Sequence, residues 1–250
     1  MKSALSAVYC NEAAKVGARK KYTVFVILGA LLSIGGILPV IFLNRVAGVM
    51  IINFDAYYMW VLPMFAEVVL PLLIFMAATD LFAAEAHDGV IRASLTRPVD
   101  RIALFTGKLA AVMTYAAVYL GCIFLTGLIV SFIMTGPDAL WPILAGLGSY
   151  LLTLVPLAVL ACFAALVAQT SKSGTLVMLL CLLIYLAAKV VTIFIPVTTE
   201  LLFTSFLGWH KLWIGAAPSA GKLLNVTLTV LGYGALFFTA GSMIFTRKDY

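Results

Sequence analysis

Long apolar runs separated by short polar stretches dominate the pattern of this chain. Six of them, near residues 22–43, 58–83, 104–134, 141–169, 173–197 and 223–246, are each long enough to cross a membrane. A bilayer core of about 30 Å needs about 20 helical residues, because each residue advances the helix by about 1.5 Å. The pattern predicts six membrane-spanning helices, with residues 1–250 forming a single transmembrane domain.

Two shorter elements complete the expected fold. Residues 3–20 place Leu5, Val8, Tyr9, Ala13 and Val16 on one helical face, which predicts an N-terminal interfacial helix. Residues 198–221, before the last span, are too apolar for a free loop and are interrupted by polar residues, so they predict a re-entrant outer segment. A histidine in this segment, His210, is expected at the membrane surface. The predicted fold class is an all-α integral membrane protein.

Composition supports lipid as the solvent. Hydrophobic residues make up 64% of the chain and charged residues only 10%, whereas soluble domains carry roughly 25% charged residues. The net charge of +6 does not indicate nucleic acid as a partner, because the basic residues follow the membrane topology instead of forming one solvated patch.

The distribution of lysine and arginine predicts the orientation. With the N-terminus in the cytoplasm, twelve of the sixteen basic residues are cytoplasmic and three face outward, as the positive-inside rule requires. All four tryptophans then lie at or near the outer interface, where an aromatic belt is expected. Both termini are predicted to be cytoplasmic, in a multi-pass protein of a bacterial-type plasma membrane.

The predicted cytoplasmic loop between spans two and three holds the most informative stretch, DLFAAEAHDGVIRASLTRPVDRIALFTGK, from Asp80 to Lys108. Its charges alternate in sign, Gly89 permits a tight break after the second span, and Pro98 ends any helix and stiffens the turn into the third. The pattern indicates a short, stiff, charged element just beneath the membrane. Such an element can carry a push from a soluble partner into the bilayer.

This loop resembles that of type-2 ATP-binding-cassette (ABC) transporter permeases. The resemblance rests on Glu85, Gly89, Arg92, Leu95, Arg97-Pro98, Arg101 and Gly107-Lys108, together with the six spans and the N-terminal helix. It implies that the loop is a coupling element that docks on a separate ATPase subunit. The residues expected to carry this coupling are Glu85, Asp88, Gly89, Arg92, Arg97, Pro98, Arg101 and Lys108.

The resemblance also implies the partners. These are a dimer of ABC ATPase subunits and a second permease copy, identical or related, within membrane lipid. The chain is not expected to be an enzyme, and no cofactor or metal is expected in it, since ATP and Mg²⁺ would bind the ATPase. The nearest approach to a phosphate-binding G-x-x-x-x-G-K-[ST] loop, GAAPSAGKL at residues 215–223, has the wrong glycine spacing and ends in leucine.

Two charges fall inside predicted spans. Glu67 in span two and Lys189 in span five each lie about 12–13 Å below the outer end of their helix. An unpaired charge at such depth costs at least about 2.5–3.5 kcal/mol on insertion scales, so each should face protein or water. We expect the two to pair or to line a substrate pathway. A purely structural ion pair, or snorkelling toward the surface, remains the alternative.

Other function classes fit less well. An intramembrane enzyme would need clustered nucleophiles or metal ligands, and the two histidines, His87 and His210, are predicted on opposite sides of the membrane. A secondary transporter or a channel not coupled to ATP stays open as the alternative. The sequence favours an ATP-driven exporter of a hydrophobic or amphipathic cargo, a peptide, lipid or drug, with amphipathic peptides preferred.

Overall fold

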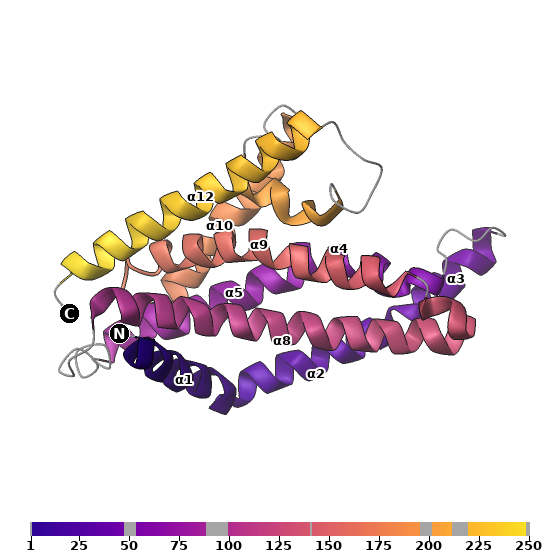
Figure 1. Cartoon of the computed structure of the whole chain (residues 1–250), viewed down its shortest axis with the longest axis horizontal. Helices are drawn as coiled ribbons and strands as arrows, with labels where there is room; N and C mark the ends of the chain where they lie inside the picture. Colours follow the sequence, from indigo (N-terminus) through magenta and orange to yellow (C-terminus); the bar gives the residue numbers. More distant parts are fainter. Residues whose placement is uncertain are drawn as a thin grey trace.

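A computed structural model describes residues 2–47, 54–88, 100–140, 142–195, 202–211 and 220–248, and over these residues the regular structure is helical. Six helices are long and apolar enough to cross a membrane, which confirms the predicted number and fold class. They are Lys20–Val46, Tyr57–His87, Arg101–Leu140, Ile143–Val167, Gly174–Phe194 and Leu223–Arg247. Figure 1 shows them gathered lengthwise around α8.

The spans are built from the following elements. Spans one and two comprise α2 (Lys20–Gly35), α3 (Ile37–Ala47), η1 (Phe54–Ala56), α4 (Tyr57–Met64), η2 (Phe65–Val69), α5 (Leu70–Ala78), η3 (Thr79–Ala84) and α6 (Glu85–His87). The later spans comprise α8 (Arg101–Thr135) with η4 (Gly136–Leu140), α9 (Ile143–Val167), α10 (Gly174–Phe194) and α12 (Ala220–Arg247). Two further helices lie outside the spans, α1 (Lys2–Ala18) and η6 (Phe203–Gly208).

Both termini lie at the same end of the bundle (Figure 1). We call this the terminal end and the other the distal end. The third span breaks at Gly136, whose φ is +68°. Its α-helix, α8, has 35 residues, so it is about 52 Å long, well over the thickness of a bilayer core of about 30 Å. It exceeds the predicted run 104–134 at both ends, which means that α8 reaches out of the apolar layer.

Burial divides the spans into an inner and an outer set. Spans two and four are the most buried, whereas α2, α10 and α12 bury only a small share of their apolar surface. Their outer faces carry exposed leucine, isoleucine and valine, such as Ile27, Leu183 and Leu228. Exposed apolar area of this extent suits contact with lipid or with another membrane protein.

Span two departs from a regular α-helix just before the second of its two prolines, Pro71. Pro71 has no N–H to donate to the carbonyl oxygen four residues earlier, which belongs to Glu67. The segment Phe65–Val69 takes a π-helical form, and the hydroxyl of Tyr185 in α10 donates a hydrogen bond to the Glu67 carbonyl at 2.6 Å. A side chain from span five thus replaces the backbone bond that proline removes.

The N-terminal helix α1 packs alongside the first turns of α8 (Figure 1). Close approach depends on Gly107, because a Cβ atom at that position would lie 2.6 Å from Cγ1 of Val8. The Tyr9 hydroxyl contacts the Thr114 hydroxyl at 2.9 Å. The glycine of the Gly107-Lys108 pair in the sequence pattern therefore makes room for α1.

The segment before the last span is partly described. Within it, η6 packs against α9 and α10 and against the π-helical turn of span two. Phe206 and Leu207 are buried there, as expected of a chain segment folded back into the protein. The rest of the predicted re-entrant segment, residues 198–201 and 212–219, lies outside the described residues.

Candidate functional site

The end of span two is held by a buried lysine from α8. Lys108 is 0% exposed, and its Nζ lies 2.5 Å from Oε2 of Glu85 and 2.8 Å from Oε2 of Glu12. Glu85 is the first residue of α6, and Glu12 belongs to α1. One ammonium group therefore joins three elements that are far apart in the sequence.

A second lysine closes this arrangement into a ring. Nζ of Lys15 lies 2.7 Å from Oε1 of Glu12 and 3.1 Å from Oε1 of Glu85. Each carboxylate thus gives one oxygen to Lys108 and the other to Lys15. We call Glu12, Lys15, Glu85 and Lys108 the ionic ring; its formal charges balance.

The ring shifts the pKa values of Glu12 and Lys15. Burial by itself raises the pKa of Glu12, but the charges and hydrogen bonds of Lys108 and Lys15 outweigh burial, and the pKa falls below its ordinary value. Burial lowers the pKa of Lys15, but hydrogen bonds and charges from Glu12 and Glu85 outweigh it, and that pKa is raised. Both shifts favour the ionised forms at neutral pH.

The start of span three is anchored to the last helix. Nη1 of Arg101 donates hydrogen bonds to the carbonyl oxygens of Thr246 at 2.7 Å and Lys248 at 3.1 Å. The last carbonyls of a helix have no intrahelical donor, so a cation there both satisfies and stabilises them. Nζ of Lys248 in turn donates to the carbonyl oxygen of Gln169 at 2.7 Å, which ties in the end of α9.

The structure brings the flanks of the predicted coupling loop together at the terminal end. Glu85 and Lys108 lie inside the ionic ring, and Arg101 lies on the end of α12. Asp88 is exposed and close to His87, with 3.1 Å between Oδ1 and Nδ1. The other predicted coupling residues, Gly89, Arg92, Arg97 and Pro98, lie outside the described residues.

Asp80, which precedes Glu85 by five residues in span two, forms a second anchor. It accepts a hydrogen bond from the Tyr22 hydroxyl at 2.6 Å, and it pairs with Arg19 at 2.9 Å and with Lys21. This group fixes the start of α2 against the end of span two.

The two intramembrane charges form an ion pair. Nζ of Lys189 lies 2.9 Å from Oε2 of Glu67, and their side chains are 28% and 37% exposed. Tyr185, one helical turn before Lys189, holds the Glu67 backbone as described above. Pairing was one of the two roles expected of these charges, and the structure shows the pair within one chain. Span five thus binds both the side chain and the backbone of Glu67.

A hollow of about 370 Å³ opens beside this pair, between spans two and five. Apart from the ion pair and Tyr185, its lining is apolar, and it consists of Val68, Pro71, Leu72, Phe75, Leu182 and Leu186. The hollow therefore presents one charged pair on an otherwise apolar surface. An amphipathic molecule could meet both chemistries here.

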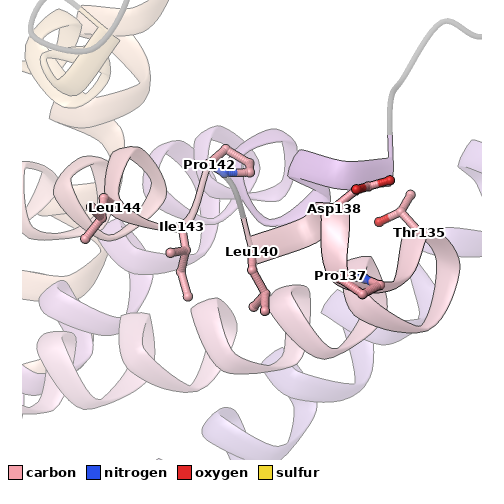
Figure 2. Close-up of a pocket in the computed structure, with 7 residues that line it drawn as sticks. All are labelled: Thr135, Pro137, Asp138, Leu140, Pro142, Ile143 and Leu144. Carbon is pink, nitrogen blue, oxygen red and sulfur yellow. The ribbon is translucent and has the colours of Figure 1, made fainter.

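A larger hollow, of about 710 Å³, lies at the connection between α8 and α9. Figure 2 shows Asp138 and Thr135 side by side there, with Leu140 and Ile143 pointing away from them. It lies at the distal end, opposite the coupling loop, and holds none of the predicted site residues. Among the described residues, no three His, Cys, Asp or Glu side chains gather as metal ligands would.

His210 is buried, contrary to the expectation of a surface position. It is 5% exposed, and its Nδ1 lies 3.2 Å from the Thr153 hydroxyl in α9. Burial, assisted by the charge of Lys211, lowers its pKa to about 4. The sequence placed this residue at the surface because polar neighbours interrupt the segment, and the packing of η6 onto α9 overrides that signal.

Sequence reasoning missed Glu12, Lys15 and Tyr185. Glu12 is a single acidic residue in a short basic helix. Its role in the ionic ring depends on Lys108, which is far away in the sequence. Tyr185 precedes Lys189 by one turn, and its role depends on the carbonyl that Pro71 leaves without a donor. Both signals become visible only when the helices are placed side by side.

Replacing Lys108 by methionine should strongly destabilise the docking of α1. It leaves two buried carboxylates facing Lys15 alone, and removing one partner of a buried ion pair typically costs about 3–5 kcal/mol. Thermal unfolding of the purified chain in detergent measures the loss, with exposed Lys172→Met as the matched control. Adding Glu12→Gln should recover part of the stability; an unchanged midpoint for Lys108→Met would refute the assignment.

Lowering the pH should destabilise the segment before the last span, because the buried His210 becomes protonated. Because its folded pKa lies below the ordinary 6.5, its stabilising contribution is complete above pH 6.5 and is lost as the pH falls from 6.5 toward about 4. We expect the unfolding midpoint to drop between pH 7 and pH 5 in the wild type and less in His210→Asn. Equal drops in both proteins would show that other groups titrate.

The sequence was also compared with known families and proteins. Residues 11–188 match the profile of a family described as ABC-2 family transporter protein. No curated protein matches the chain significantly. The matched segment includes α1 from Asn11 onward, the coupling loop and Glu67, and it ends one residue before Lys189. It spans well over half of the sequence, and the chain therefore belongs to the ABC-2 family of transporters, as a multi-pass membrane permease.

Proposed function

We propose that this chain is the permease subunit of an ATP-driven exporter, which moves a hydrophobic or amphipathic cargo outward with energy from a separate ATPase. The observation that carries the proposal is the connection between spans two and three. In a chain that belongs to the ABC-2 family, this connection is anchored on both flanks to different helices. Membership of the family itself implies an ABC ATPase as partner.

The anchoring explains how a force on the loop could reach other helices. Before the loop, Glu85 is bonded through the ionic ring to α1 and α8. After the loop, Arg101 is bonded to the end of α12. A force on the loop therefore acts on three helices together rather than on one turn of chain.

The loop itself supplies the contact with the ATPase. Arg92 and Arg97 carry the charge, while Gly89 and Pro98 shape the element, and exposed Asp88 borders it. Glu85 and Lys108 are buried, so their part is to position the loop rather than to touch the partner. ATP-driven closure of the ATPase dimer would then switch the permease between inward and outward access as a rigid-body change.

The cargo path runs beside the Glu67–Lys189 pair. One chain forms only one wall of this hollow, since Val68 and Leu186 are exposed beside it. A second permease copy, related by a two-fold axis, would complete the cavity. An apolar wall with one ion pair suits a peptide, lipid or drug that carries both apolar and charged groups. Amphipathic peptides fit best.

Both termini are cytoplasmic on this proposal. The terminal end carries Lys15, Arg19, Lys20, Lys21 and Arg101, and the positive-inside rule assigns such an end to the cytoplasm. Labelling of single cysteines from either side of intact cells tests this orientation, with Cys10 on α1 as the natural inner reporter because it is exposed.

Reversing the charge at Arg97 should uncouple hydrolysis from transport. The Arg97→Glu chain should fold and bind lipid as before, while its repulsion from the docking groove lowers cargo-stimulated ATP hydrolysis by about tenfold or more, the loss expected when a hydrogen-bonded charge contact is broken. The complex is purified from its native membrane through the tagged permease and reconstituted in liposomes.

Lys172→Glu is the matched control, since it reverses an exposed charge on the connection between α9 and α10. Normal stimulation in Arg97→Glu would refute the docking assignment. A purified permease with no ATPase subunit, and with transport indifferent to nucleotide, would instead favour a secondary transporter or a channel.

The ion pair in spans two and five is tested by exchanging its members. Glu67→Gln and Lys189→Met should each lower transport by roughly tenfold or more, because one charge loses its partner at a depth where this costs about 2.5–3.5 kcal/mol on insertion scales. The double variant Glu67→Lys with Lys189→Glu restores the pair in reverse. It should regain thermal stability but not transport.

That difference separates a pathway from a purely structural pair. If the exchanged pair restores transport as well as stability, the pair serves folding only. Full transport in both single variants would remove Glu67 and Lys189 from the pathway altogether.

A further inference from the structure

A second hollow lies at the elbow between α1 and α2, where both helices meet α8. It has a volume of about 260 Å³ and a lining of mostly carbon atoms. The residues that shape it are Ala13 and Gly17 of α1, Thr23 and Val26 of α2, and Ala111 and Val118 of α8. We call it the elbow groove.

The elbow groove stays open because small residues form its floor. Ala13, Gly17 and Ala111 leave space between helices that otherwise pack closely. A Cβ atom added at Gly17 would meet nothing within 4 Å. Val118 is exposed at the rim, so the groove opens on the surface of the span, which faces lipid.

Three cations stand at the start of α2, next to the residues that line this groove. Lys20 is in the first turn, three residues before Thr23, so the two lie on the same side of α2, and Arg19 precedes the helix as its N-cap. Arg19 and Lys21 are 37% and 42% exposed, and both pair with the single carboxylate of Asp80. One positive charge of that group is left over. Exposed Lys20, which has no ion-pair partner among the described residues, adds another.

We propose that the elbow groove binds an anionic phospholipid. One acyl chain lies along Val26 and Val118, and the phosphate meets the surplus charge of Arg19, Lys20 and Lys21. Basic residues beside a membrane helix recognise anionic headgroups in this way. A neutral lipid would fill the same apolar space but would leave the cations without a counter-charge, and a helix from another protein would need a larger groove.

The bound lipid would touch both α1 and α2. Since α1 carries Glu12 and Lys15 of the ionic ring, occupancy of the elbow groove favours the docked position of α1 and thereby the position of the coupling loop. The groove lies in the cytoplasmic leaflet only if the proposed orientation holds. Binding itself requires neither that orientation nor ATP.

Lipid binding is measured on the full-length chain in detergent by native mass spectrometry, with phosphatidylglycerol and phosphatidylcholine of identical acyl chains. We expect the wild type to bind phosphatidylglycerol more tightly. Lys20→Gln should weaken phosphatidylglycerol binding by about fivefold, the effect of one basic residue near an anionic surface, and leave phosphatidylcholine unchanged. Lys172→Gln removes the same charge away from the groove and should change neither.

Gly17→Leu adds a side chain at the floor of the elbow groove, where a Cβ atom would meet nothing within 4 Å, and should abolish the tight site. Gly232→Leu, where a Cβ atom also meets nothing, should leave the site intact. Equal binding of the two lipids by the wild type would overturn the proposal. Unchanged phosphatidylglycerol binding in Gly17→Leu would overturn it as well, because the groove would then not be the site. Lipid binding is measured without nucleotide and without transport. Neither result therefore decides whether the chain is part of an exporter.

Discussion

The burial of Lys108 is the constraint on which the terminal end of this protein depends. An ammonium group cannot be taken out of water without partners, and at 0% exposure the side chain needs both carboxylates within hydrogen-bond distance. Those carboxylates come from α1 and α6, so the position of each helix is tied to the position of the other two. Gly107 then sets how closely α1 can approach, since the backbone of α8 meets Val8 there.

The same logic applies at the other flank of the loop. Arg101 satisfies carbonyl groups at the end of α12 that no backbone donor reaches. Together the two anchors fix the end of span two and the start of span three against other helices. A displacement of either flank would therefore act on α1, α8 and α12 and not on one span alone.

Much of the fold could be predicted from the sequence, because in a membrane the length of an apolar run determines whether it forms a spanning helix. The six runs needed no knowledge of packing, and their observed bounds differ mainly at α8, where polar turns extend the helix beyond the apolar run. The similar depths of Glu67 and Lys189 made an ion pair one of two expectations, because opposite charges at one level in an apolar layer have few other partners, and the structure shows that pair.

The parts that could not be predicted are those that rest on contacts between distant residues. Glu12 gains its role from Lys108, and His210 is buried because η6 folds onto α9. Neither position carries a periodic or compositional signal. Two of the four basic residues in the loop pattern, Arg101 and Lys108, contact other parts of the same chain. A sequence motif does not show whether a residue faces the interior of the protein or its surface.

The proline in span two has a mechanical consequence. At Pro71 the helix gives up one of its own lengthwise bonds and takes a sideways one from Tyr185 instead. Spans two and five cannot slide past each other along their length without breaking that bond, and the ion pair between Lys189 and Glu67 adds a second link at the same level. The two links together fix the lengthwise register of the two spans beside the hollow.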